Sequence, residues 1–182
     1  MKTLILLLSL GMASTAQAQA TWKGLSFGQS RDNVRAALSA QNFEVETSQE
    51  GSLQSVSDYQ LLLPGMRNAL PLRAEFRFTD AGGLMDITLS LDFAIMKQNF
   101  PSIGGDEALL DFASEKLTRA LTDRYATPTS RQSDCDADAG TIAKRPVACA
   151  INWHDPGQSV ELNWFTHGPR LFIRYQMLAP DL

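Results

Sequence analysis

The apolar positions in the second half of the chain repeat with two different periods. Between Asp106 and about Tyr125 they recur every three or four residues, the spacing that gives a helix one apolar side. This stripe consists of Leu110, Ala113, Leu117, Ala120, Leu121 and Tyr125. Three later segments, Val147–His154, Ser159–Thr166 and Arg170–Met177, alternate apolar and polar residues, as strands with one buried face do. Because neither surface can be buried alone, we expect the helix to pack on these strands.

The first half of the chain repeats this order of elements on a smaller scale. Ser30 is a typical helix N-cap, and the short helix after it should end near Gln41-Asn42. Short strands are expected over Phe43–Glu46 and Val56–Leu63, with a polar loop over Thr47–Leu53 between them. This half therefore also begins with a helix and continues with strands.

The clearest hairpin lies near the end of this half. Residues 72–79 and 85–93 alternate apolar and polar side chains on either side of the turn Asp80-Ala81-Gly82-Gly83. One face of the hairpin is apolar and the other is charged, as in an antiparallel sheet that is covered on one side. Asp86 and Asp92 are expected on the solvated face.

The order of elements predicts an α+β protein, in which helices pack on one face of an antiparallel sheet. Two fused halves, each a helix followed by strands, are one form of this architecture. They would span residues 21–96 and 106–182, joined by a linker over Lys97–Gly105 that contains Pro101 and Gly104-Gly105.

The first twenty residues have the pattern of a secretory signal peptide. Lys2 precedes the apolar run Leu4–Leu10, and small residues follow at the expected cleavage sites, so the mature chain should begin at Gln19 or Thr21. A membrane-spanning helix needs roughly 20 apolar residues, which this run does not supply. The chain has two cysteines, both far from this segment, so no lipid anchor is expected. We expect a periplasmic or extracellular protein without a membrane span.

The charge balance and the cysteines narrow the picture further. Loss of Lys2 leaves 15 basic against 20 acidic residues, a balance that argues against nucleic acid or an anionic membrane surface as partner. In an exported protein, Cys135 and Cys149 favour a structural disulfide, which would stabilise the fold by about 3 kcal/mol. The alternative, a redox pair, lacks the Cys-x-x-Cys spacing.

No local motif indicates a metal site, a cofactor or a catalytic residue. The acidic segment 134–140 lacks the glycine and the glutamate positions of an EF-hand loop. His154 and His167 should end neighbouring strands, so their imidazoles would lie at opposite ends of the middle strand, about 25 Å apart. This distance is too long for the two to share a zinc ion. Ser30 is not in a nucleophile elbow, because Asp32 stands where the second glycine would be.

Two short motifs resemble those of known exported proteins. Gly24-x-x-Phe27-Gly28-x-Ser30-x-x-x-Val34 resembles the helix opening of the small lipoprotein of the barrel-assembly machinery and of the β-lactamase inhibitory proteins. The segment Arg124-Tyr125-Ala126-Thr127-Pro128 is similar to a helix ending in periplasmic proteins that often have glycine where Ala126 stands. The resemblance implies tandem helix-plus-sheet halves that bind other proteins, although the lipid-modified cysteine is absent. It assigns a role to no individual residue.

The aromatic residues of the last two strands suggest a partner surface. Alternation places Phe165 and Phe172 on the polar side of the sheet. A tight Gly168-Pro169 turn would pair Phe165 with Phe172, His167 with Arg170, and Asn163 with Arg174. Such a pair can simply stabilise the sheet, by about 0.2–1 kcal/mol, or it can anchor a protein partner or a second copy.

The sequence thus favours an exported, non-enzymatic protein that binds another protein or an envelope component. The alternative is a hydrolase whose site is assembled from scattered residues. A small-ligand carrier ranks last, because the strands are too few and too short for a closed barrel with a roomy cavity.

Overall fold

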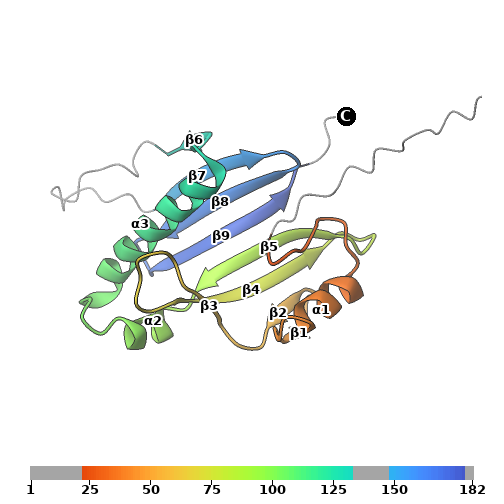
Figure 1. Cartoon of the computed structure of the whole chain (residues 1–182), viewed down its shortest axis with the longest axis horizontal. Coiled ribbons are helices and arrows are strands. Elements are labelled where there is room, and N and C mark those ends of the chain that lie inside the picture. The colour runs from red at the N-terminus through yellow and green to blue at the C-terminus, as the bar shows by residue number, and fades with distance from the viewer. Residues whose placement is uncertain (1–21, 133–147, 179–182) are drawn as a thin grey trace, which may run out of the picture.

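The computed structural model describes residues 22–132 and 148–178, and within them the chain forms one antiparallel sheet of nine strands with three helices (Figure 1). The helices are α1 (Arg31–Ser39), α2 (Phe93–Asn99) and α3 (Gly105–Tyr125). The strands of the first half are β1 (Val45–Thr47), β2 (Leu53–Ser55), β3 (Tyr59–Leu61), β4 (Leu70–Phe78) and β5 (Leu84–Leu91). Those of the second half are β6 (Ser130–Arg131), β7 (Ala148–Asp155), β8 (Gln158–Phe165) and β9 (Arg170–Met177).

The sheet is continuous through both halves. Its order is β1-β2-β4-β5-β9-β8-β7-β6, with β3 beside the first part of β4, and the neighbouring strands are antiparallel. The seam between the halves is the β5–β9 pair, in which Leu89 lies opposite Ile173. The predicted α+β architecture with an antiparallel sheet is confirmed.

Helix α1 begins where the sequence predicts. The side-chain oxygen of Ser30 accepts a hydrogen bond from the backbone N–H of Asn33 at 3.4 Å, which satisfies one of the free donors of the first turn. Val34 and Leu38 are buried on the inner side of the helix. The polar loop expected over 47–53 differs in detail, because it ends in strand β2.

The long helix α3 also agrees with its apolar stripe. Leu110, Ala113, Leu117 and Leu121 are buried, and so are Leu109 and Ser114 beside them. The helix ends at Ala126, whose φ of +64° lies in the region that favours glycine. This conformation explains why glycine would suit the position that the sequence resemblance singled out.

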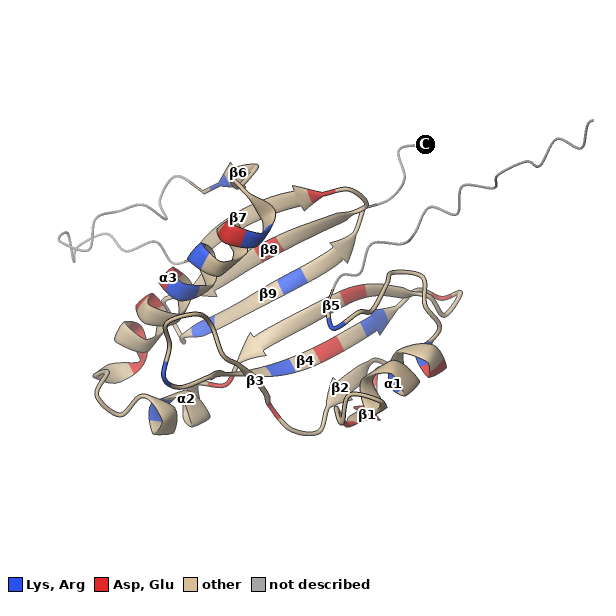
Figure 2. Ribbon diagram, viewed as in Figure 1, with Lys and Arg blue, Asp and Glu red and all other residues tan. Residues whose placement is uncertain are grey.

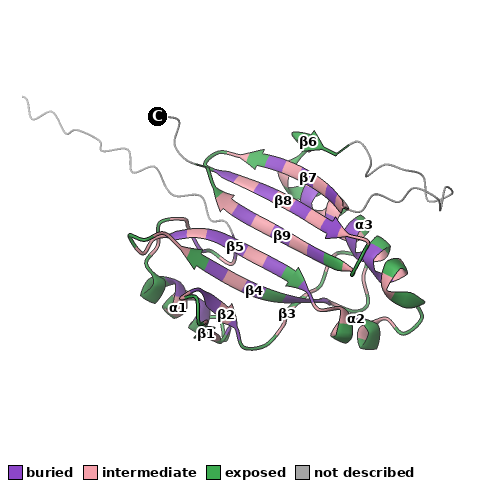
Figure 3. Ribbon diagram, turned by 180° about the vertical axis from the view of Figure 1, so that it is seen from behind, coloured by how far each residue is buried: buried purple, intermediate pink, exposed green. Residues whose placement is uncertain are grey.

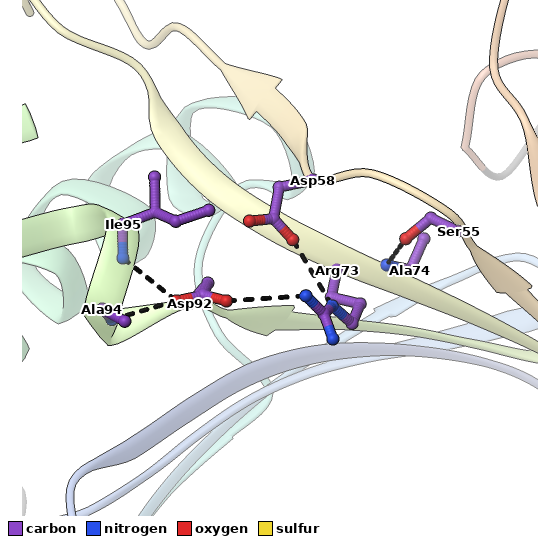
Figure 4. A network of polar contacts seen from close by, with 7 residues as sticks. All are labelled: Ser55, Asp58, Arg73, Ala74, Asp92, Ala94 and Ile95. Carbon is purple, nitrogen blue, oxygen red and sulfur yellow. Dashed lines mark hydrogen bonds and ion pairs between the residues drawn. The ribbon is translucent and has the colours of Figure 1, made fainter.

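A small polar network corrects two expectations about the segment between the halves. The expected linker over 97–105 includes the end of α2, and Asp92 is the N-cap of that helix rather than a solvated strand residue. Its Oδ1 accepts hydrogen bonds from the backbone N–H groups of Ala94 and Ile95 at 2.9 and 3.1 Å. Arg73 links Asp92 to Asp58, with N–O distances of 3.6 and 3.4 Å (Figure 4). The network fastens α2 to β4.

The two faces of the sheet have different surroundings. Helix α3 packs against β7, β8 and β9, and α2 packs against α3 and β4. Seen from behind, the long strands are crossed by no helix (Figure 3). We call the helix-bearing side the covered face and the other side the open face. Alternation along β8 shows the difference, since Val160, Leu162 and Trp164 are buried while their neighbours are half-buried.

Candidate binding cleft and open sheet face

A cleft of about 390 Å³ lies on the covered face, over the seam between the two halves. Its floor is formed by Leu89 of β5 with Ile173 and Tyr175 of β9. One wall is the side of α3, with Leu117, Ala120, Leu121 and Arg124. The opposite wall consists of Trp22, Lys23, Tyr59, Leu61 and Leu63. The cleft therefore occupies the space between α3 and the segments that precede β4.

The wall opposite α3 begins with a tight turn. The backbone N–H of Leu25 donates to the carbonyl of Trp22 at 3.0 Å, and the central residues Lys23 and Gly24 have φ of +50° and +75°. Two successive positive φ angles are typical of a type I′ turn. Glycine adopts this conformation freely, but Lys23 pays a steric cost there. The side-chain amide of Gln41 donates to the carbonyl of Lys23 at 2.9 Å and holds the turn against α1.

An aromatic cluster surrounds the ammonium group of Lys23. The nitrogen lies 4.3 Å from the ring centroid of Tyr59, 5.4 Å from that of Phe43 and 5.6 Å from that of Trp22. The ring of Trp22 meets those of Phe43 and Tyr59 edge to face, with centroids 5.6 and 5.4 Å apart. These contacts fix the position of the charge, since a cation is attracted to the faces of aromatic rings.

The charges that line the cleft have one sign. Among the described residues that line it, Lys23 and Arg124 are the charged ones and none is a carboxylate, although the whole chain has a net charge of −4. The guanidinium of Arg124 lies 5.1 Å from the ring centroid of Tyr125. On the floor, burial raises the pKa of Tyr175, and neighbouring Tyr125 adds to the effect. Tyr175 is therefore a neutral phenol throughout the physiological range.

The open face carries a row of alternating charges across four adjacent strands. Arg77 of β4 lies opposite Asp86 of β5, and Arg174 of β9 lies opposite Glu161 of β8. Asp86 forms an ion pair with Arg174 and accepts a hydrogen bond from the Thr88 hydroxyl at 2.9 Å. Figure 2 shows red and blue bands on β4, β5, β9 and β8. We call Arg77, Asp86, Arg174 and Glu161 the charge row.

The burial of Asp86 corrects the expectation that it is solvated. Its exposed fraction is 0%, the same as that of the central core leucines. Alternation placed Asp86 on the correct face, but Arg77 and Gln176 lie opposite it on the two neighbouring strands and Arg174 forms an ion pair with it. Arg174, expected to be part of a partner surface, is thus engaged within the protein.

The predicted register of the last hairpin was wrong by two residues. Phe165 lies opposite Arg170, Asn163 opposite Phe172, and Glu161 opposite Arg174. The connection is a turn over residues 166–169 that contains His167, rather than the Gly168-Pro169 pair alone. A shift by two keeps every side chain on the same face, so alternation cannot distinguish the two registers. Phe165 and Phe172 still stack as diagonal neighbours, with ring centroids 6.2 Å apart, and both are half-buried.

His154 lies near the end of β7, as the sequence predicts, whereas β8 ends at Phe165 and His167 lies in the turn after it. His154 is opposite Ser159 in the β7–β8 pair, and its Nδ1 is 2.6 Å from the hydroxyl oxygen of Thr129. That hydroxyl also lies 3.1 Å from the backbone oxygen of Asn152. His167 is exposed in the β8–β9 turn. Within residues 22–132 and 148–178, no three histidine, cysteine or acidic side chains come together as metal ligands would.

Several expectations concern residues outside the described ranges. They include the signal peptide over residues 1–20, the acidic segment 134–140, and Cys135. Cys149 is buried on the covered face of β7, and its predicted bond to Cys135 stays a prediction. In the part of the chain that the structure describes, no helix has the length and apolar character needed to cross a membrane.

Comparison of the chain with protein-family models, with curated proteins and with solved structures finds no significant match. The geometry of the cleft and of the open face is therefore the basis for any functional argument. Sequence analysis missed the cleft, because its two walls come from segments that no local pattern brings together. The Lys23-Gly24 turn is the one local feature that could have drawn attention to this wall.

Proposed function

We propose that this chain is an exported, non-enzymatic binding protein that takes up a small ligand with an apolar body in the cleft. The observation that carries the proposal is the cleft itself, whose floor combines strands from both halves. Its volume of about 390 Å³ falls within the range of small-molecule sites. Export is supported by the pattern of residues 1–20.

The lining favours binding of such a ligand through the burial of apolar surface. Of the twelve lining residues, two are cations, one is Ala120, and the other nine are larger aliphatic or aromatic residues. Entry of an alkyl chain therefore removes apolar surface from water on both partners. Tyr59, Leu61 and Leu63 are only half-buried, and a ligand would cover them further. The floor is formed by paired residues of two adjacent strands, β5 and β9, in which Leu89 lies opposite Ile173, so the fold positions it without a ligand.

The proposal is tested by blocking the cleft from the helix side. Ala120 is half-buried on the wall of α3, and Ala120→Trp would fill the space that an alkyl chain needs. The matched control is Ala36→Trp, an exposed position of α1. Titration calorimetry with decanol should show binding to the parent protein and to the control, and loss of binding to the Ala120 variant. Failure of the parent to bind, or unchanged binding by the Ala120 variant, would contradict the proposal.

A second proposal places a protein partner, or a second copy of the chain, on the open face. It is favoured by the stacked pair Phe165 and Phe172, which is half-buried on a face that no helix crosses. The sequence resemblance to protein-binding exported proteins points the same way. Asn163 lies beside Phe172 in the pairing, and exposed His167 borders the patch in the turn. These residues are the ones that such a partner would contact.

The alternative of a hydrolase gains little support from the described residues. The nearest arrangement to a nucleophile with its base is Thr129 with His154. The Thr129 hydroxyl and its backbone N–H both lie within hydrogen-bonding distance of the Asn152 oxygen, at 3.1 and 2.8 Å. This geometry has a structural explanation, since it continues the pairing of β6 with β7.

A further inference from the structure

We infer that the cleft selects a monocarboxylate with an apolar tail, and that Lys23 recognises the carboxylate. This inference rests on the proposed function, because it assigns the chemical class of the ligand to the same cleft. The tail would lie on Leu89, Ile173 and the α3 wall, and the headgroup would meet the ammonium at the opposite wall.

The first argument is charge complementarity. Of the lining residues that the structure describes, two are cations and none is a carboxylate, in a chain whose net charge is −4. Among the described residues, Lys23 makes no ion pair with an acidic side chain; its contacts are with the three rings. A neutral hydroxyl would displace water from this ammonium and return a hydrogen bond without an opposite charge. A carboxylate would replace that water with a charge-assisted hydrogen bond.

The second argument is the way in which the charge is positioned. Lys23 occupies a positive-φ position that glycine would fill without strain. The Gln41 amide and the Trp22–Leu25 backbone bond hold the turn, while the rings of Tyr59 and Trp22 hold the side chain at the edge of the cleft. A strained residue that its surroundings fix in place is a frequent feature of binding sites. The competing explanation is that Lys23 only stabilises the aromatic cluster by cation–π contacts.

Three ligands with the same tail separate these explanations. Decanoate and decylammonium, each below its micelle concentration, and decanol, below its solubility limit, are titrated into the mature protein by calorimetry. We expect decanoate to bind about tenfold more tightly than decanol, since a hydrogen bond to a charged group contributes that much. Decylammonium should bind most weakly. The advantage of decanoate over decanol should shrink as salt is added, because salt screens the attraction.

Variants then assign the effect to Lys23. Lys23→Gln should lose about tenfold in decanoate affinity and bring decanoate level with decanol, whereas Lys23→Arg should retain most of the preference. The charge-matched control is Lys97→Gln in α2, whose ammonium pairs with Asp106 at 2.7 Å outside the cleft. This control should bind all three ligands like the parent. Decanol binding by the Lys23→Gln protein reports that its cleft is intact.

The outcomes separate the inference from the proposed function. If none of the three decyl compounds binds the parent, the proposed function fails, and the inference fails with it. If all three bind equally well, the cleft is a binding site without charge selection and the inference alone is overturned. The same conclusion follows if Lys23→Gln retains the parent's preference for decanoate, or if its decanol binding is lost together with that for decanoate.

Discussion

The two faces of the sheet are built from the same strands but differ in which side chains they leave accessible and which they bury. On the covered face, Leu89, Ile173 and Tyr175 form a buried apolar floor, and the half-buried residues Tyr59, Leu61 and Leu63 of the wall leave apolar surface accessible in the cleft. On the open face, the residues next to them in the chain are polar except for Phe172, yet Asp86 of the same face is as deeply buried as any core leucine. The comparison shows that side-chain type does not by itself tell which side of this sheet is closed. An apolar surface is left partly open on one side, and a charge is enclosed on the other.

The physical reason for this inversion differs between the faces. The apolar side of the sheet can be covered only by other segments of the chain. Helix α3 and the wall opposite it, which begins with Trp22, do not meet over the seam. On the open face Asp86 is buried within the sheet itself, where Arg174 of the neighbouring strand β9 forms an ion pair with it. Long cationic side chains can cover surface with their aliphatic stems.

The largest difference between the faces should appear in the free energy of unfolding. Leu162 is fully buried on the covered face of β8, and the next residue, Asn163, is half-buried on the open face. Leu162→Ala should lower the unfolding free energy by about 3 kcal/mol, because it leaves a cavity under α3. Asn163→Ala should change it by less than about 0.5 kcal/mol. Denaturant titration of both variants measures the contrast, and equal losses would remove the distinction between the faces.

The next effect concerns the enclosed charge. Asp86→Ala should destabilise the protein by about 2 kcal/mol, because Arg174 and the Thr88 hydroxyl both lose their partner. Arg174 is one-third exposed on its side chain, which keeps the cost below that of a fully buried pair. Asp80→Ala in the exposed β4–β5 turn is the control and should cost less than about 0.5 kcal/mol. Comparable melting curves for the two variants would mean that the charge row is solvated after all.

The smallest effect on stability is expected at the aromatic pair. Phe165→Ser combined with Phe172→Ser should lower the unfolding free energy by about 1 kcal/mol, the scale of a cross-strand aromatic contact. If the open face binds a second copy, sedimentation should show weaker self-association in this variant. Val56→Ser with Leu62→Ser removes two exposed apolar side chains elsewhere and should leave association unchanged. A double Phe variant that associates like the parent, or that unfolds, would assign the pair a structural role only.

Local pattern was enough to predict most elements of this fold. The Ser30 cap, the span of α3 and the exact bounds of β9 all follow from short-range periodicity. The register of β8 with β9 did not follow, because a two-residue shift preserves alternation. The burial of Asp86 and the cleft could not be predicted either. Both depend on residues that lie far apart in the chain, as with Asp86 and Arg174 or Lys23 and Arg124.

The most direct test of the account is to observe which face of the sheet responds to decanoate. Methyl resonances of Leu89, Ile173 and Leu121 report on the cleft, and the methyl group of Thr88, next to Leu89 but on the open face, is an internal control. We predict that titration with decanoate shifts the three cleft methyl signals and leaves that of Thr88 in place. A shift of the Thr88 methyl signal while those of Leu89, Ile173 and Leu121 stay unchanged would contradict the account.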